Sequence, residues 1–254
     1  MQLPGVDIAE PLIAKLEQFT KLSSQDKAAL AHVTNEPSRQ LQSGQDLIRE
    51  GENPETVKLV LEGWACRYKQ LEDGRRQIIA FFLPGDLCDT HVYVLREMDH
   101  SIGALTPLSY VEIDRQKLEA ATSEHARLAH ALWWDTLVTA AVQREWTVNL
   151  GQRDAVERLG HLFCELFTRL RGIGLAEGDT CPMPVNQQQL GDAMGVTSVH
   201  VNRSLQELRG KDLIVLKRRQ LTIPDFDALQ AFSLFNPNYL HLGRIGRHLD
   251  ANEA

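Results

Sequence analysis

Residues 186–223 read NQQQLGDAMGVTSVHVNRSLQELRGKDLIVLKRRQLTI, and this stretch predicts the fold of the C-terminal part of the chain. A short helix is expected over 186–194, followed by a tight turn at Gly195 and a second helix that Thr197 caps and Gly210 ends. Apolar residues on one face of each helix are Leu190, Ala193, Met194, Val201, Leu205 and Leu208. Two short helices joined by a glycine turn, the second of them amphipathic, are typical of a helix-turn-helix.

The residues after the second helix predict a basic wing. Apolar runs at 213–216 and 220–223 bracket Lys217-Arg218-Arg219, which indicates a β-hairpin. Residues 186–223 contain six basic and three acidic side chains, whereas the whole chain has a net charge of −7. The basic part is therefore the part with the helix-turn-helix pattern, as expected of a surface that contacts phosphates. We predict double-stranded DNA as the partner.

The exposed face of the second helix carries the candidates for reading base edges. Arg203 is the strongest, because a guanidinium can bind O6 and N7 of guanine with two hydrogen bonds, and Asn202 could pair with adenine in the same way. Val199 can contact only the methyl group of thymine. The predicted base-reading residues are Ser198, Val199, His200, Asn202 and Arg203, and the predicted phosphate contacts are Thr197, Gln206, Lys217, Arg218 and Arg219. For each polar residue, the alternative is a solvated helix face.

Composition and length limit the class of protein. The chain has 254 residues, 43% of them hydrophobic and 24% charged, which excludes a largely disordered protein and suits two domains. No apolar run approaches the ~18–20 residues that cross a membrane. The N-terminus lacks a basic region followed by an apolar stretch, so we expect a cytoplasmic protein without a membrane partner. The cysteines are widely spaced, with no CxxC, and are expected to be reduced and mostly buried: Cys66, Cys88, Cys164 and Cys181.

Upstream of the helix-turn-helix, the sequence pattern changes twice. Residues 8–34 predict short helices, the second with a capped start at Ser23 to Asp26. From 37 to 115 short apolar runs alternate with glycines, and Glu72-Asp73-Gly74 predicts a hairpin turn, which indicates a small β-barrel or β-roll. Residues 123–148 contain no Gly or Pro, and their apolar residues cover more than one face of a helix. We expect a second subunit to cover part of this helix, with an intrachain core helix as the alternative. The predicted dimer-interface residues are Leu128, Leu132, Trp134, Val138, Ala141 and Val142.

This layout resembles the Crp/Fnr family of bacterial transcription regulators over roughly residues 10–230. The resemblance is carried by the β-roll that ends in Phe82-Leu83-Pro84-Gly85-Asp86, the helix over 154–170, which a capping-box pattern of Asp154 and Glu157 opens, and the segment from Gly195 to Leu205. Within that segment, Arg203 falls at the arginine that the family uses on guanine.

The resemblance implies an α+β fold in four parts. Residues 1–122 would form a jelly-roll-like, cyclic-nucleotide-binding-like β-roll sensor domain with N-terminal helices, and 123–150 the dimerisation helix. Residues 151–240 would form the winged helix-turn-helix domain, and 241–254 a flexible tail. The resemblance also implies a homodimer on a pseudo-palindromic operator, controlled allosterically from the β-roll by an unidentified signal, with RNA polymerase as a further partner. The apolar stretch 225–240 is expected to fold back onto the winged domain or onto the partner subunit.

Two departures from the family pattern bear on specificity. Many members have a Glu where this chain has Val199, so we expect the operator to differ from the common half-sites. In the effector pocket, Thr90 stands where cyclic-AMP binders have a Glu, and His100-Ser101 stands where they have an Arg-Ser or Arg-Thr pair. A cyclic phosphodiester would lack its main charged partner, so cyclic AMP is not expected. The predicted effector-pocket residues are Asp86, Thr90, His100 and Ser101.

No cofactor, metal site or catalytic residue is predicted. Residues 1–60 contain no cysteine, which excludes the iron–sulfur cluster of the oxygen-sensing branch. Haem ligation by His91 or His100 and a redox role of Cys88 or Cys181 stay as alternatives. No GxSxG, GxxxxGK[ST], GxGxxG or HExxH motif supports an enzyme. A sensor module whose helix-turn-helix contacts protein is the remaining alternative, and the basic wing argues against it.

Overall fold

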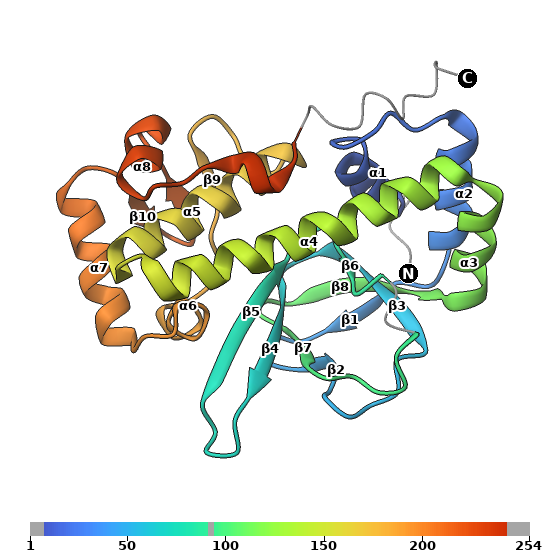
Figure 1. Ribbon diagram of the computed structural model, residues 1–254, viewed down its shortest axis with the longest axis horizontal. Coiled ribbons are helices and arrows are strands. Elements are labelled where there is room, and N and C mark those ends of the chain that lie inside the picture. The colour runs from blue at the N-terminus through green and yellow to red at the C-terminus, as the bar shows by residue number, and fades with distance from the viewer. Residues whose placement is uncertain (1–7, 91–93, 243–254) are drawn as a thin grey trace. The chain divides into compact units, whose positions relative to one another are not determined.

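The structure, a computed structural model, describes residues 8–90 and 94–242 (Figure 1). These residues form two compact units. The first contains the described residues up to 67, 81–139 and 241–242, and the second contains 68–80 and 140–240. Most of the expected flexible tail at 241–254 lies outside the described residues. Within them, no helix combines the length and hydropathy needed to cross a membrane.

The first unit contains the predicted antiparallel strands. They form two four-stranded sheets, with the strand orders β1-β8-β3-β6 and β2-β7-β4-β5. The strands are β1 (Arg39–Leu41), β2 (Asp46–Ile48), β3 (Thr56–Glu62), β4 (Ala65–Gln70), β5 (Arg76–Phe82), β6 (Leu87–Cys88), β7 (Ser101–Ala104) and β8 (Leu108–Asp114). The turn predicted at Glu72-Asp73-Gly74 joins β4 to β5, and Gly74 has a φ of +86°. The end of this hairpin, 68–80, groups with the second unit.

Strand β8 shows how alternation along the sequence produces two cores. Leu108 and Tyr110 face a core that draws on both four-stranded sheets. Val111 and Ile113 face a second core, which the helices α1–α3 and the N-terminal part of α4 complete. Successive side chains of a strand point to opposite faces, so one short strand contributes to both cores.

The helices of the first unit have local start signals. α2 (Ser24–Thr34) begins with a capping box between Ser23 and Asp26, as predicted, and α3 (Arg115–Glu124) is capped by Asp114. α1 (Glu10–Leu16) carries Lys15, whose Nζ lies 2.8 Å from Asp86 and 2.6 Å from Asp135. Although burial opposes it, the charge of these two carboxylates raises the pKa of Lys15. The ion triad therefore ties α1 to the β-roll and to α4.

The predicted long helix is α4 (Ala126–Gln152), and the second unit is built around the next helix. α5 (Ala155–Gly172) opens with the predicted capping box of Asp154 and Glu157, and eleven of its residues are buried. The other elements are β9 (Thr180–Pro182), α6 (Gln187–Met194), α7 (Ser198–Gly210), β10 (Val215–Lys217), β11 (Gln220–Thr222), α8 (Phe226–Phe232) and the 3-10 turn η2 (Pro237–Leu240). The expected folding back of 225–240 is confirmed, because α8 packs on α5.

A fully buried histidine lies where α4 meets α5. The Asn149 amide lies 3.0 Å from Nδ1 of His161, and the Glu145 carboxylate lies 3.2 Å from Nε2. Asn149 accepts a hydrogen bond from Arg153, which directs its N–H group toward Nδ1. Burial and the Arg153 cation lower the pKa of His161 to about 3. The imidazole is therefore neutral in the folded state.

The His161→Gln variant tests this protonation state. The unfolded chain protonates the imidazole near pH 6.5 and the folded chain only near pH 3. The contribution of neutral His161 to stability is thus present above pH 6.5 and declines as the pH falls from 6.5 toward 3, by up to about 4–5 kcal/mol. Urea unfolding between pH 7.5 and 4.5 should show a flatter pH dependence for His161→Gln than for the wild type. The exposed control His32→Gln should retain the wild-type slope; identical slopes in all three proteins would contradict the assignment.

Candidate nucleic-acid interface

The helix-turn-helix is assembled by two helix caps and a glycine turn, of which the turn at Gly195 and the cap at Thr197 were predicted from the sequence. The Asn186 side chain and Gln189 form a capping box at the start of α6. Gly195 then adopts a left-handed conformation with φ +67°, which glycine tolerates without a Cβ penalty. The side chain of Thr197 accepts a hydrogen bond from the backbone N–H of His200 and so caps α7. A short helix, a glycine turn and a capped second helix follow one another as predicted.

α7 separates a buried face from a polar face. Val201, Leu205 and Leu208 are buried, and this face packs against α5. The opposite face exposes Thr197, Val199, His200, Arg203 and Gln206, while Ser198 and Asn202 are half-buried. Val199 is 58% exposed although it is apolar. The structure therefore brings all the predicted base-reading residues to the solvent side of one helix and its N-cap.

The wing is a tight hairpin with basic residues at its tip. β10 and β11 pair antiparallel, with Lys217 opposite Gln220, and Arg218 and Arg219 form the turn with φ of +50° and +61°. The Arg209 guanidinium donates a hydrogen bond to the Leu216 carbonyl and links α7 to the wing. The third strand of this sheet, β9, was not predicted from the sequence. It is only three residues long and pairs with β11, which is forty residues away in the chain.

The charged side chains of this surface are available to an anionic partner. Arg203, Lys217, Arg218 and Arg219 are all exposed, and within the described part of the chain none has an ion-pair partner. The first turn of α7 contains no acidic residue, so the N-terminal end of the helix macrodipole is not neutralised. The surface thus presents fixed positive charge beside an exposed helix face of about two and a half turns.

Comparisons with known proteins agree with this geometry. Residues 157–232 match the family described as Crp-like helix-turn-helix domain, and residues 38–125 match the cyclic nucleotide-binding domain. The nitrogen fixation regulation protein FixK of Azorhizobium caulinodans is 31% identical over 179 residues, which cover 69% of this chain and 71% of that protein. The chain belongs to the Crp/Fnr family of transcription regulators. It is a DNA-binding regulator with the α+β fold of that family.

Two further relatives support the Crp/Fnr assignment. The transcriptional activator protein FnrL of Cereibacter sphaeroides is 27% identical over 195 residues, covering 75% of this chain and 78% of that protein. The solved structure of FixK2 from Bradyrhizobium japonicum superposes with a TM-score of 0.69 at 26% identity, covering 77% of this chain and 96% of that chain.

The sensor domain of this Crp/Fnr protein contains a cavity of about 260 Å³. Of the predicted pocket residues, Thr90 and His100 line it, but Asp86 and Ser101 do not. Asp86 instead pairs with Lys15 and accepts the backbone N–H of Leu83, and Ser101 accepts the backbone N–H of Glu50. The remaining lining residues were not predicted: Arg67, Leu87, Asp89, Leu95, Asp135, Thr136 and Thr139.

The charges that line this cavity are already paired. Arg67 forms an ion pair with Asp89, and the other oxygen of Asp89 lies 2.8 Å from Nε2 of His100. Although burial acts in the opposite direction, the hydrogen bond from His100 and the charge of Arg67 lower the pKa of Asp89. Asp135 pairs with Lys15. Arg67 could have been recognised as a site candidate, because it is a charge within the strand 65–70, where its neighbours are apolar. His91, the other haem candidate, lies outside the described residues.

The six residues predicted for the dimer interface differ in how far their own chain buries them. Leu128 and Leu132 belong to the helix-covered core of the first unit, and Ala141 and Val142 are also buried within the chain. Leu128 and Leu132 are 0% and 1% exposed, and Ala141 and Val142 are 4% and 8% exposed, so these four have little surface left to bury on association. Trp134 and Val138 are half-buried, whereas Trp133 and Leu137 are 58% and 60% exposed. The sequence showed that α4 is apolar on several sides but not which side its own chain covers.

Arg203→Ala and Arg219→Ala separate the predicted roles on DNA. Arg203→Ala should reduce the discrimination between guanine and the other bases at one operator position by about 1–3 kcal/mol, because the bidentate base contact is lost. Arg219→Ala should weaken binding to all sequences alike and reduce the salt slope by about 1, because one phosphate contact is lost. Binding of single-base operator variants at several salt concentrations measures both effects. Arg115→Ala, at an exposed arginine of the sensor domain, is the matched control; equal effects of the two test variants on every sequence would contradict the division of roles.

Proposed function

We propose that this Crp/Fnr protein acts in the cytoplasm as a homodimer that binds a pseudo-palindromic operator, and that its β-roll controls binding allosterically. The observation that carries the proposal is the exposed polar face of α7 beside the exposed basic tip of the wing. A helix of this kind enters the major groove, while the wing contacts phosphates. In a symmetric dimer, two such helices would lie about 34 Å apart, one turn of DNA. RNA polymerase is the further partner that family membership suggests.

The homodimer is supported by a heptad pattern of exposed residues on α4. Eight of the exposed positions follow one another at alternating intervals of four and three: Ala126, His130, Trp133, Leu137, Ala140, Arg144, Thr147 and Gly151. Thr136, Val148, Leu150 and Gln152 are also exposed and lie beside this row. We call this surface the α4 seam. A repeat of 3.5 residues is the spacing at which two helices pack side by side. Exposed Trp133 and Leu137 give the seam an apolar centre that water disfavours, so a second copy of the chain is the proposed occupant.

The sensor cavity supports an effector other than a cyclic nucleotide. Arg67, His100 and Asp135 all face partners within the first unit, so an incoming cyclic phosphate would have to compete with carboxylates already in place. The effector that we propose is a small molecule that fits about 260 Å³ without supplying a phosphate.

Selection of fragmented genomic DNA by the purified full-length protein tests the regulator proposal. We expect a recurrent palindrome whose half-sites are about one helical turn apart, at physiological salt and equally with or without cyclic AMP. Recovery of a motif only when cyclic AMP is present would overturn the cavity assignment. Salt-sensitive recovery of all fragments without any motif would contradict sequence-specific regulation.

Leu137→Glu tests the α4 seam. A buried carboxylate on each subunit would face its symmetry mate across the interface, so we expect the variant to sediment as a monomer and to lose most of its operator affinity. Leu71→Glu makes the same change at another exposed leucine, 54% exposed in the β4–β5 turn, and should remain dimeric. Circular dichroism of both variants verifies folding. A dimeric Leu137→Glu protein would contradict the seam.

A further inference from the structure

Residues 233–240 follow α8 and lie beyond the span 157–232 that matches the Crp-like helix-turn-helix domain. We call this segment the clamp. It is not a loose tail, because Ser233, Phe235, Tyr239 and Leu240 are all buried. Its aromatic rings pack on His161 of α5, with the Phe235 ring at 5.1 Å and the Tyr239 ring stacked at 5.9 Å between centroids. Four of the eight clamp side chains are therefore buried, whereas Leu234, Asn236, Pro237 and Asn238 are exposed.

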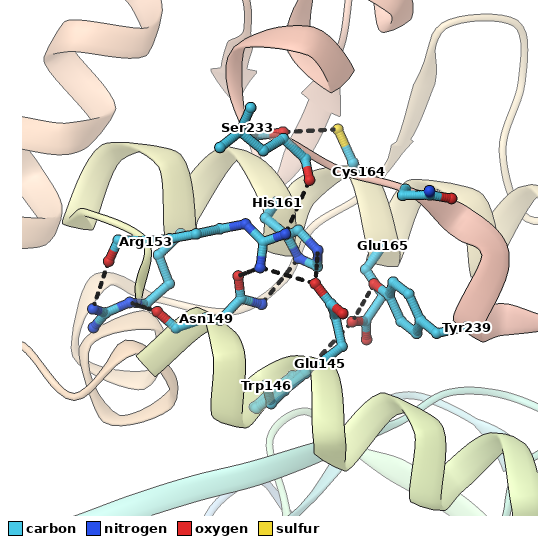
Figure 2. A network of polar contacts seen from close by, with 12 residues as sticks. Glu145, Trp146, Asn149, Arg153, His161, Cys164, Glu165, Ser233 and Tyr239 are labelled. Atoms are coloured by element: carbon cyan, nitrogen blue, oxygen red, sulfur yellow. Dashed lines mark hydrogen bonds and ion pairs between the residues drawn. The ribbon is translucent and has the colours of Figure 1, made fainter. Parts of the chain in front are cut away.

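The clamp lies at the junction between α4 and α5 (Figure 2). Only Arg153 and Asp154 separate the end of α4 from the start of α5. Side chains from both helices and from the clamp point toward one another in a single polar network. The direction that α5 takes away from α4 depends on this junction, and α5 packs against α7.

The first link from the clamp is to the carboxylate of Glu165 on α5. The Tyr239 hydroxyl donates to Oε2 at 2.9 Å, and Nε1 of Trp146 on α4 donates to the same oxygen at 3.0 Å. Glu165 is fully buried, and burial raises its pKa although Arg169 and these hydrogen bonds oppose the rise. One oxygen thus joins α4, α5 and the clamp, and it needs both donors because water does not reach it.

The second link is to the junction residue Arg153. Its guanidinium donates to the backbone carbonyl of Leu234 in the clamp at 2.9 Å. The same group lies 2.8 Å from Glu145 and donates to Asn149 at 2.9 Å, both on α4. Arg153 therefore ties the clamp to the last two turns of α4. The clamp contacts α4 through Arg153 and α5 through Glu165, one on either side of the junction.

The third link is a close approach at Gly160 of α5. A Cβ placed at Gly160 would lie 3.0 Å from the Cβ of Ser233 and 3.3 Å from Leu229. The Ser233 hydroxyl donates to the Leu229 carbonyl and lies 3.8 Å from the Cys164 thiol. A glycine within a helix costs stability relative to alanine, and here it lets the beginning of the clamp lie directly against α5.

We propose that Tyr239, Arg153 and Gly160 are positioning residues that fix the direction of α5 relative to the end of α4, and that the clamp thereby sets the operator spacing that the dimer accepts. This inference rests on the proposed homodimeric regulator. Each recognition helix is packed on α5, and the α4 seams hold the two subunits together. An α5 held in one direction places the two recognition helices at one separation, whereas an α5 free to swing accepts several.

Tyr239→Phe is the first test, because it removes one hydrogen bond and keeps the aromatic packing. We measure affinity for the palindrome recovered by selection and for versions with one base pair added to or removed from the centre. The wild type should discriminate strongly against both altered spacers. Tyr239→Phe should lower that discrimination by about ten-fold, the effect of one hydrogen bond to a buried carboxylate. Its preference among half-site bases should stay unchanged, because α7 is untouched.

Matched variants distinguish a change in the direction of α5 from a general loss of stability. Tyr110→Phe makes the same change at a buried tyrosine of the sensor domain and should keep the wild-type spacing preference. Gly160→Ala perturbs the clamp without removing a hydrogen bond and should also relax the spacing preference. If Tyr239→Phe fails to fold, the spacing preference of Gly160→Ala is the deciding measurement. Loss of stability by itself would lower affinity for every spacer equally.

Two outcomes overturn the inference in different ways. Unchanged spacing discrimination in both Tyr239→Phe and Gly160→Ala, with a wild type that binds its palindrome, refutes the clamp and leaves the regulator intact. A wild type that binds no palindrome refutes the proposed function and the clamp with it. Amide hydrogen exchange at 147–157 provides a readout without DNA: faster exchange at the junction in Tyr239→Phe, but not in Tyr110→Phe, is expected, and equal rates would refute the clamp.

Discussion

The constraint on which the DNA-binding half depends is the burial of α5 on nearly every side. From Leu159 to Leu170 only Arg169 is not buried. A helix with so little exposed surface must be covered by other elements, and α6, α7, α8 and β9 all pack against it. The recognition helix is therefore held rigidly on its apolar side, which leaves its polar face free for another molecule. Rigid support of this kind allows side chains on a helix to meet base edges at fixed positions.

Burial on this scale forces polar groups to find partners inside the protein. α5 carries Glu165 and His161 within its buried surface: Glu165 accepts hydrogen bonds from Trp146 of α4 and Tyr239 of the C-terminal segment, and Nδ1 of His161 is paired with Asn149 of α4. An unpaired buried polar group costs about 1–3 kcal/mol, so the network constrains geometry more than apolar packing alone. The contacts that satisfy these groups are also the contacts that fix the α4–α5 junction. The same contacts therefore pair the buried polar groups and position the recognition helix.

In the sensor domain, buried charged groups are also paired within the protein, and here the pairs lie at a cavity. Its cavity is bordered by two sets of paired side chains, Lys15 with Asp86 and Asp135, and Arg67 with Asp89, which also contacts His100. Both sets lie in or beside the cavity that the family fold provides. Family membership predicts the cavity, but the pairing within it depends on side chains from strands and helices distant in sequence. A match to the cyclic nucleotide-binding domain therefore describes the fold of this domain and not its ligand.

The sequence by itself determined the features that depend on neighbouring residues. Caps at Ser23, Asp154 and Thr197, the turns at Gly74 and Gly195, and the basic wing are all local signals, because a cap or a turn is completed within three or four residues. The alternation of strands and the helical period of 186–210 likewise follow from the chain's own pattern. Together they predicted the β-roll, the long helix and the helix-turn-helix in their correct order.

Only the tertiary structure decided which apolar faces meet and which charges pair. Leu132 and Trp133 are adjacent on an apolar helix, and the sequence could not show that the first is buried while the second is exposed. Arg67 and Asp89 meet across twenty-two residues, and Tyr239 and Glu165 across seventy-four. The three residues of β9 form a strand only because β11 is beside them. Such contacts arise when distant segments bury surface together, and the free energy that selects them comes from the whole core and not from local propensity.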